Sequence, residues 1–364
     1  MGVKVVFTAG GTGGHIYPAI AIAEELKSMN DSADILFIGG SRTMERDIIG
    51  RAGFPMVPLS VIGLPRRISP RQVVFFWKFG VSTIRSLLLL QREKPVCVFA
   101  TGGYVSGPPV FAARALGIPV YLQEQNSYPG IATRTLARFS RMVFLGFEDA
   151  ARNLRPDVKT LVTGNPVRRG IDSAKRSEAA ERLGLHPALR TVFVFGGSQG
   201  ARVINETVAE IAGGIVDRGF QLIWQTGAGE YERWRGIEKT GSIRVMSYID
   251  DMAQAYAASD IVVARAGAMT IAEMTVCGLP GIMIPLATSA GNHQEHNARS
   301  LERAGVARMI GEEDLTPDRL LNEITALLTD DTQRDRMAEA SRRFGNRNAA
   351  RTIAEFILKK NGVN

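Results

Sequence analysis

The chain has 364 residues, 45% of them apolar, and a mean hydropathy close to zero. These values predict a soluble globular protein of about two domains, each large enough to bury its own core. The net charge of +8 favours anionic partners such as nucleic acid, phosphorylated ligands or an acidic membrane face. The two cysteines, Cys97 and Cys277, lie in apolar segments without Cys-x-x-Cys spacing, which excludes a disulfide framework and predicts reduced core residues. The chain runs straight into a strand, so no signal peptide is expected.

A glycine-rich loop follows the first predicted strand, residues 3–8. It reads Ala-Gly-Gly-Thr-Gly-Gly-His over residues 9–15, and a helix is expected from Pro18 to about Met29. Backbone N–H groups at such a helix start form a site for phosphate or sugar oxygens. The G-x-G-x-x-G pattern fails because Ile16 stands where the last glycine should be, and the chain has no Gly-Lys pair for a Walker A loop. The loop therefore has the form of an anion site without the pattern for NAD or ATP.

The most apolar segment is a predicted helix from Ser69-Pro70 to about Glu93. Two charges interrupt it, so no transmembrane span is expected. The alternative to a surface role is an ordinary core helix, above all for the second half. The first half combines aromatic and cationic residues, as an interfacial membrane patch does; these residues are Phe75, Phe76, Trp77, Arg66, Arg67, Arg71 and Lys78.

Two more predicted strands in this half end in polar loops. Residues 96–100 lead into a second glycine loop over residues 101–107, and residues 119–122 lead into Gln-Glu-Gln-Asn over residues 123–126. Because the carboxyl ends of parallel strands meet at one edge, these loops should gather around one crevice with His15 and Glu124. Alternatively, His15 caps a helix and Glu124 accepts hydrogen bonds from loop amides.

The pattern of strand, glycine loop and helix restarts after residues 161–170, whose Pro and Gly content is that of an interdomain connector. Residues 191–195 form the strand, and residues 196–201 form the loop. The sequence therefore predicts two similar α/β domains with parallel sheets that face each other across a cleft.

Residues 261–297 of the second half contain another candidate site. A strand enters a turn of small residues at 265–268, and a helix follows over residues 269–277. The helix start suits a diphosphate. Glu273 lies one turn into this helix, within reach of ribose hydroxyls, and Gln294 follows in the next loop. An ordinary βαβ unit with Gly267 and Gly278 as packing residues is the alternative.

The chemistry that remains is group transfer from a nucleotide diphosphate. The chain has no D-x-D tripeptide and no Ser/His/Asp constellation, and His293 and His296 lack a third metal ligand. Positioning and electrostatic support of the leaving phosphate would supply most of the rate. A single base would deprotonate an acceptor hydroxyl, and His15 is favoured over Glu124 because histidine changes charge closer to neutral pH.

Six motifs, in this order along essentially the whole chain, resemble the MurG family; they occupy residues 10–15, 100–108, 124–126, 164–168, 196–201 and 267–297. The resemblance implies a GT-B fold of two Rossmann-like domains. It implies inverting transfer of N-acetylglucosamine from UDP-GlcNAc to the C4 hydroxyl of the MurNAc of lipid I, which gives lipid II and UDP for peptidoglycan. No cofactor and no metal are implied. The family commonly has histidine before the Glu-Gln-Asn triplet, where this chain has Gln123.

The resemblance also assigns domains. Residues 1–164 would bind the acceptor and associate with the membrane, residues 165–345 would bind UDP-GlcNAc, and residues 346–364 would form a helix that packs back on the first domain. The partners would be UDP-GlcNAc, lipid I and the anionic cytoplasmic face of the inner membrane, held peripherally, and no nucleic acid.

The residue roles that follow from the resemblance fall into four sets. The catalytic candidates are His15 and Glu124. UDP-GlcNAc would contact Thr12, Gly13, Gly14, Asn126, Arg168, Ser198 (diphosphate), Ile249 (uracil), Glu273 (ribose) and Gln294 (sugar hydroxyls). The acceptor diphosphate would contact Gly11, Gly102, Gly103 and Tyr104. The membrane patch would comprise Val73, Phe75, Phe76, Trp77 and Phe79.

Two other classes remain open at this point. A UDP-GlcNAc 2-epimerase would have a similar fold but no need of a membrane patch. A non-catalytic scaffold would bind the sugar nucleotide without His15 or Glu273, and both residues are present.

Overall fold

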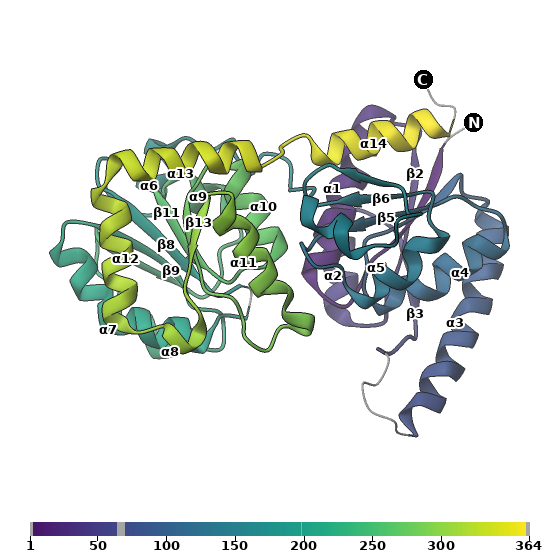
Figure 1. Cartoon of the computed structure of the whole chain (residues 1–364), viewed down its shortest axis with the longest axis horizontal. Helices are drawn as coiled ribbons and strands as arrows, with labels where there is room; N and C mark the ends of the chain where they lie inside the picture. Colours follow the sequence, from purple (N-terminus) through teal and green to yellow (C-terminus); the bar gives the residue numbers. More distant parts are fainter. Residues whose placement is uncertain (1–2, 64–69, 198, 362–364) are drawn as a thin grey trace. The chain divides into compact units, whose positions relative to one another are not determined.

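The computed structural model describes residues 3–63, 70–197 and 199–361 (Figure 1). The chain divides into two compact units: unit 1 comprises Met1–Arg168 and Arg347–Asn364, and unit 2 comprises Arg169–Asn346. Each unit contains one parallel β-sheet covered by helices. The sequence had predicted two such α/β domains, and the architecture confirms this.

The sheet of unit 1 has the strand order β3-β2-β1-β4-β5-β6-β7. Its strands are short apolar runs, as expected for a parallel sheet buried on both faces. In β1, Val5 and Phe7 enter one core cluster while Val6 enters the other. The strands are β1 (Lys4–Thr8), β2 (Asp34–Gly40), β3 (Met56–Leu59), β4 (Cys97–Ala100), β5 (Val120–Glu124), β6 (Met142–Leu145) and β7 (Thr160–Val162).

Helices cover both faces of this sheet. Residues of α1, α2 and α14 enter the first cluster, and residues of α3 and α4 enter the second. The helices are α1 (Gly13–Met29), α2 (Thr43–Arg51), α3 (Arg71–Glu93), α4 (Gly107–Ala115), α5 (Ile131–Leu136) and α14 (Ala349–Lys360), with short 3₁₀ turns η1 (Tyr104–Ser106), η2 (Ala137–Phe139) and η3 (Glu148–Asn153).

Three segments of unit 1 differ from the sequence-based expectation or extend it. Helix α1 begins at Gly13 and not at Pro18, because Thr12 is extended at its N-cap and the glycines belong to the first turn. The connector predicted over residues 161–170 begins too early, because Thr160–Val162 pairs with β6 as an edge strand. The last helix, α14, packs on the sheet of unit 1, and Phe356 lies 5.2 Å from Phe144 between ring centroids.

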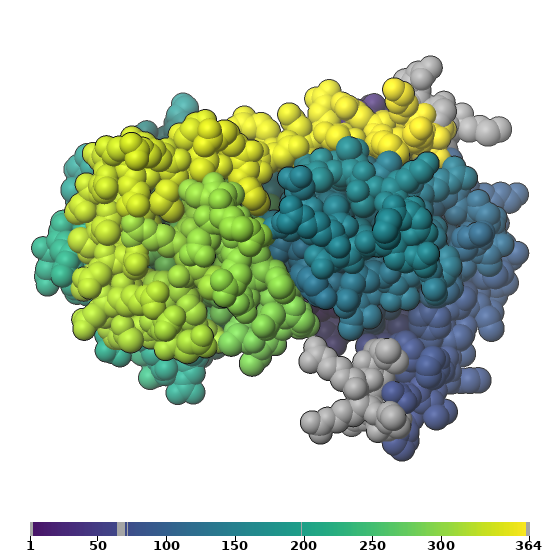
Figure 2. All heavy atoms as spheres, viewed as in Figure 1, coloured from purple at the N-terminus to yellow at the C-terminus, as the bar shows by residue number. Residues whose placement is uncertain are grey.

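Helix α3 has one packed side and one exposed apolar side. Phe79 stacks edge-on against Phe111 of α4 at 5.7 Å, and Leu90 is buried. Val73, Phe76 and Trp77 are 65–73% exposed, and Ile84 and Leu88 are also exposed. α3 forms part of the outer surface of unit 1 (Figure 1, Figure 2).

By length and composition alone, α3 is the one helix among the described residues that is long and apolar enough to cross a membrane, and 17% of that stretch is buried. Ser69, the expected cap, and Arg66 and Arg67 lie outside the described residues.

The sheet of unit 2 has the order β10-β9-β8-β11-β12-β13. Val192 and Val194 of β8 face a core formed with α7 and α12, whereas Phe193 faces Tyr256 of α9 at 5.7 Å. The strands are β8 (Thr191–Phe195), β9 (Gln221–Gln225), β10 (Ile243–Met246), β11 (Ile261–Ala264), β12 (Gly281–Met283) and β13 (Ala307–Met309). The helices are α6 (Arg176–Arg182), α7 (Arg202–Asp217), α8 (Tyr231–Trp234), α9 (Met252–Ala257), α10 (Ala268–Val276), α11 (His293–Arg303), α12 (Pro317–Thr329) and α13 (Asp331–Phe344), with 3₁₀ turns η4 (Arg235–Ile237), η5 (Ala290–Asn292) and η6 (Glu312–Asp314).

Both cysteines are free thiols, and Cys97 is buried in β4. Burial raises the pKa of the Cys97 thiol to about 12, because the apolar core disfavours the thiolate. At pH 8 only roughly 10⁻⁴ of this thiol is ionised in the folded chain. We therefore expect Cys97, isolated in a Cys277→Ser variant, to resist iodoacetamide at pH 8 until urea unfolds the protein, as measured by mass spectrometry. Labelling at the same rate with and without urea would contradict this assignment.

Candidate active site

The loops predicted to bind ligands in unit 1 all follow carboxyl ends of neighbouring strands. Residues 9–15 follow β1, residues 101–107 follow β4, and residues 125–130 follow β5. In the sheet, β1 lies between β2 and β4, so the chain turns in opposite directions after β1 and after β4. Open α/β sheets bind ligands at such a switch point, because the loops diverge there and leave room between them.

His15 is held to the end of β4 by hydrogen bonds in both directions. Its Nδ1 lies 3.0 Å from the carbonyl oxygen of Thr101 and 2.9 Å from Oε1 of Gln125. The hydroxyl of Thr101 donates to the carbonyl oxygen of His15 at 2.6 Å. The imidazole therefore lies on the second glycine loop in a fixed orientation, as the sequence had suggested by placing both at one edge.

Two glycines make this approach of the loops possible. Gly102 and Gly103 have φ angles of +101° and +79°, which side-chain-bearing residues rarely adopt. A Cβ on Gly102 would lie 3.1 Å from Nδ1 of His15, and a Cβ on Gly103 would lie 2.2 Å from the carbonyl oxygen of Gly10. The first and second glycine loops thus touch through backbone that leaves no room for a side chain.

Glu124 stabilises the loop that follows it by accepting hydrogen bonds. Its carboxylate accepts hydrogen bonds from the N–H of Asn126 at 3.0 Å, from the side-chain amide of Asn126 at 3.1 Å and from the N–H of Gly130 at 3.2 Å. It is buried. This is the alternative role foreseen for Glu124, an acceptor for loop amides, and it makes His15 the better placed candidate base.

A carboxylate of the chain itself, that of Glu45, binds the first glycine loop. The sequence analysis did not predict this contact. Glu45, in the first turn of α2, accepts a hydrogen bond from the N–H of Gly11 at 2.8 Å and another from the N–H of Gly40. It is fully buried. An acidic residue in the first turn of a helix usually stabilises that helix alone, so the sequence offered no signal for this contact. The N–H of Gly11, expected to bind the acceptor diphosphate, is occupied in this structure.

The remaining predicted residues of unit 1 surround the start of α1. Thr12 is its exposed N-cap, and Gly13 and Gly14 form its first turn. The ring of Tyr104 lies against Gly11, 3.4 Å from the position of a Cβ there. The guanidinium of Arg168 lies 5.4 Å from the ring centroid of Tyr17 in α1.

Unit 2 repeats the glycine loop before α7. A Cβ on Gly200 would lie 2.1 Å from the carbonyl oxygen of Thr226, and Gly200 has φ +80°. Asn205 of α7 donates to the same carbonyl at 2.8 Å. The loop after β8 is therefore held against the end of β9. Ser198, expected to contact a diphosphate, lies outside the described residues.

A second residue missed by sequence reasoning joins this loop to the predicted uracil site. Gln225, at the end of β9, accepts a hydrogen bond from the N–H of Ile249 at 2.8 Å and donates to the carbonyl oxygen of Gly197 at 3.1 Å. One buried side chain thus fixes two segments that lie 52 residues apart along the chain (249 minus 197). Only the pairing of β9 with β8 and β10 brings them together.

Glu273 and Gln294 are both held by the elements around them. Glu273, in α10, is buried and accepts a hydrogen bond from the hydroxyl of Tyr256 at 3.2 Å. Gln294 was expected in a loop but lies in the first turn of α11, and its Oε1 accepts from the N–H of Leu286, in the loop after β12, at 2.9 Å. Arg265 anchors the same edge through its ion pair with Glu312. Both predicted residues therefore follow carboxyl ends of the strands of unit 2.

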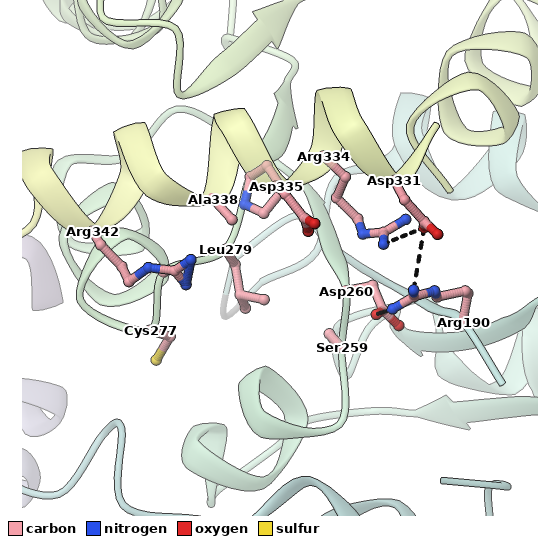
Figure 3. A pocket seen from close by; sticks show the side chains of 12 residues that line it. Arg190, Ser259, Asp260, Cys277, Leu279, Asp331, Arg334, Asp335, Ala338 and Arg342 are labelled. Atoms are coloured by element: carbon pink, nitrogen blue, oxygen red, sulfur yellow. Dashed lines mark hydrogen bonds and ion pairs between the residues drawn. The ribbon is translucent and has the colours of Figure 1, made fainter. Parts of the chain in front are cut away.

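A pocket of about 320 Å³ lies at the opposite, amino-terminal edge of this sheet (Figure 3). Its walls carry an ion-pair network in which Arg190 binds Asp260 at 2.8 Å and Asp331 at 3.2 Å, and Arg334 binds Asp331. The hydrogen bond from Arg334 lowers the pKa of Asp331. The network joins α13 to the sheet. None of the predicted site residues lines the pocket.

Within the described part of the chain, no cluster of three or more His, Cys, Asp or Glu is placed to hold a metal ion.

Comparisons with known proteins agree over nearly the whole length. Residues 5–145 match the glycosyltransferase family 28 N-terminal domain, and residues 191–355 match the C-terminal domain of the same family. The chain is 39% identical to the UDP-N-acetylglucosamine–N-acetylmuramyl-(pentapeptide) pyrophosphoryl-undecaprenol N-acetylglucosamine transferase of Acetivibrio thermocellus, over 98% of this chain and 97% of the relative.

Solved structures show the same fold. MurG of Acinetobacter baumannii superposes with a TM-score of 0.78 at 26% identity, over 98% of this chain and 99% of that one. A UDP-GlcNAc 2-epimerase from Neisseria meningitidis superposes with a TM-score of 0.69 at 18% identity, over 98% and 100% of the two chains. The second match supports the fold alone.

The contact between Gly103 and Gly10 gives a test of the loop architecture. Replacing Gly103 with Ala should destabilise the protein by well over the cost of about 1 kcal/mol for a side chain at positive φ, because the new methyl group also meets the Gly10 carbonyl. Gly117→Ala is the matched control, since Gly117 has φ +73° and open space around it. Urea unfolding should show the larger loss for Gly103→Ala. Equal losses would mean that the two loops do not constrain each other.

Proposed function

The chain belongs to the MurG family of N-acetylglucosamine transferases, and we propose from this premise which part of the molecule serves which substrate. Its reaction transfers N-acetylglucosamine from UDP-GlcNAc to pyrophosphoryl-undecaprenol-linked N-acetylmuramyl-pentapeptide, the step that makes lipid II. We assign the acceptor to unit 1 and the donor to unit 2. The observation that carries the assignment in unit 1 is the fixed imidazole of His15 between two glycine loops.

In this assignment His15 acts as the general base. It takes the proton of the C4 hydroxyl of MurNAc as that oxygen attacks C1 of the donor sugar, and UDP leaves with the bonding electrons on its diphosphate. Attack opposite the leaving group inverts the configuration at C1. A positioned base contributes roughly 10²–10⁴-fold to such a step. Gly102, Gly103 and Tyr104 line the acceptor diphosphate, while Glu124 holds the loop that carries Asn126.

The donor assignment rests on the loops of unit 2. The loop 196–201 precedes α7, whose sixteen residues place a partial positive charge at the diphosphate that departs. Gln225 positions Ile249 for the uracil, Glu273 in α10 holds the ribose, and Gln294 holds the sugar hydroxyls. Charge that develops on the leaving UDP is stabilised by dipoles already in place, so little reorganisation accompanies the reaction.

The membrane assignment rests on α3. A polyprenyl acceptor stays in the bilayer, so the enzyme must work at the surface of the inner membrane. Val73, Phe76 and Trp77 expose apolar surface from one helix, and the exposed cations Arg85 and Arg92 lie further along it. A helix with exposed apolar and cationic side chains suits peripheral binding to an anionic leaflet. Phe75 and Phe79, which the sequence also assigned to the patch, belong to the packed side of α3, where their ring centroids lie 5.7 Å apart. They pack beneath the exposed residues.

The base assignment is tested with labelled UDP-GlcNAc and a short-chain lipid I analogue. His15→Ala should lower kcat by about 10²–10⁴-fold because no other base replaces the imidazole. His186→Ala is the matched control, since His186 is exposed at the amino-terminal edge of the other sheet and should leave kcat unchanged.

Each outcome of this assay has a meaning. Near-full turnover of His15→Ala would remove His15 as the base. Absence of label from the lipid product of the wild type would overturn the transferase assignment, and release of free ManNAc would favour the epimerase. Transfer should persist in chelator, and its loss would show a metal requirement.

The membrane assignment is tested by vesicle sedimentation. Replacing Phe76 and Trp77 together with Ser should weaken binding to phosphatidylglycerol vesicles by about tenfold or more, since each aromatic side chain contributes roughly 1.5–3 kcal/mol when it leaves water. Val203→Ser, at an exposed apolar position of unit 2, should leave binding intact. Unchanged binding of the double variant would refute α3 as the membrane surface.

A further inference from the structure

A chain of three buried amide side chains ends at His15. Gln123, Gln125 and Asn165 are 1%, 2% and 5% exposed. The side-chain amide of Asn165 donates to the backbone carbonyl of Gln125 at 2.8 Å, and the amide of Gln123 donates to Oδ1 of Asn165 at 2.8 Å. The amide of Gln125 donates to the carbonyl oxygen of Thr101 at 2.7 Å and to Oε1 of Gln123. The segment after β7 is thereby joined to the imidazole through side chains alone.

These contacts leave one orientation for Gln125. Its nitrogen faces the backbone carbonyls of Thr101 and Gln123, and carbonyl oxygens only accept hydrogen bonds. A flipped Gln125 would place oxygen against oxygen at both contacts and would leave buried polar groups unpaired. Oε1 of Gln125 must therefore point at Nδ1 of His15, 2.9 Å away.

The two oxygens beside Nδ1 decide where the proton of His15 lies. Thr101 and Gln125 both present acceptors to this nitrogen, so Nδ1 carries the hydrogen. Nε2 makes no hydrogen bond within the described residues and keeps its lone pair. A base that must take a proton from a substrate hydroxyl needs this tautomer, with the free lone pair on the nitrogen away from the protein.

We infer that Gln125 is a positioning residue that fixes His15 as the Nδ1–H tautomer, and that Gln123 and Asn165 hold Gln125 in the orientation this requires. The inference deepens the proposed function and rests on it for the role of Nε2 as the base. Gln123 stands where the family commonly has histidine. In this chain an amide makes both contacts, accepting from Gln125 and donating to Asn165.

The first test reads the tautomer directly. The full chain is labelled with ¹⁵N-histidine, and the imidazole nitrogens are observed by NMR at alkaline pH, with His15→Gln to identify the signals of His15. The wild type should show the proton on Nδ1. Gln125→Leu should shift His15 towards a mixture of tautomers, because one of its two acceptors is lost.

The second test reads turnover in the same variants. Gln125→Leu should lower kcat by about tenfold, with KM for UDP-GlcNAc within twofold of the wild type, because the donor site is untouched. Gln221→Leu removes a buried amide from the amino-terminal edge of the sheet of unit 2 and should alter neither the tautomer nor the kcat.

A wild-type His15 with its proton on Nε2, or a Gln125→Leu variant with an unchanged tautomer, would overturn this inference even if transfer to the lipid acceptor is observed. Conversely, absence of transfer in the wild type with the expected tautomers would overturn the proposed function and leave the role of Gln125 in place. The wild-type spectrum decides the first point even if Gln125→Leu does not fold.

Discussion

The site in unit 1 depends on one contact, the two-way hydrogen bonding between His15 and Thr101. The hydroxyl of Thr101 donates to the backbone of His15, and the imidazole meets the backbone carbonyl of Thr101 in return. The contact needs β1 and β4 to be neighbours, and it needs Gly102 and Gly103 at positive φ so that backbone can pass beside the ring. A side chain at either glycine would push the second loop away from the first, and the imidazole would lose its fixed direction.

Both units contain the same arrangement of a glycine loop and a buried glutamine. In each, a glycine loop after a strand is pressed against the end of its neighbour: Gly103 lies on the carbonyl of Gly10, and Gly200 lies on the carbonyl of Thr226. A buried glutamine then ties the loop to a third segment, Gln125 in unit 1 and Gln225 in unit 2. Neutral amides suit this task, because each one donates and accepts without placing a charge beside a diphosphate or a base.

The sequence was sufficient for the architecture because its signals are local. Strand, glycine loop and helix follow one another twice, and the apolar runs that form β1, β4, β8 and β11 are typical of parallel strands buried on both faces. The motif order then identified the family, and the relatives bear this out. Local signals failed at boundaries. Pro18 suggested a helix start one turn too late, and the edge strand β7 was taken for connector, because its pairing partner lies elsewhere in the chain.

The sequence by itself determined the two α/β domains, the glycine loops and the residues that flank them, because those features depend on residue type and spacing along a few turns of chain. Tertiary structure alone decided which groups meet. It put Glu45 on the N–H of Gly11, turned Glu124 towards its own loop, and separated the exposed Phe76 from the packed Phe79 on one helix. Each of these outcomes depends on a hydrogen bond or packing contact between segments brought together by strand order, which no local pattern encodes.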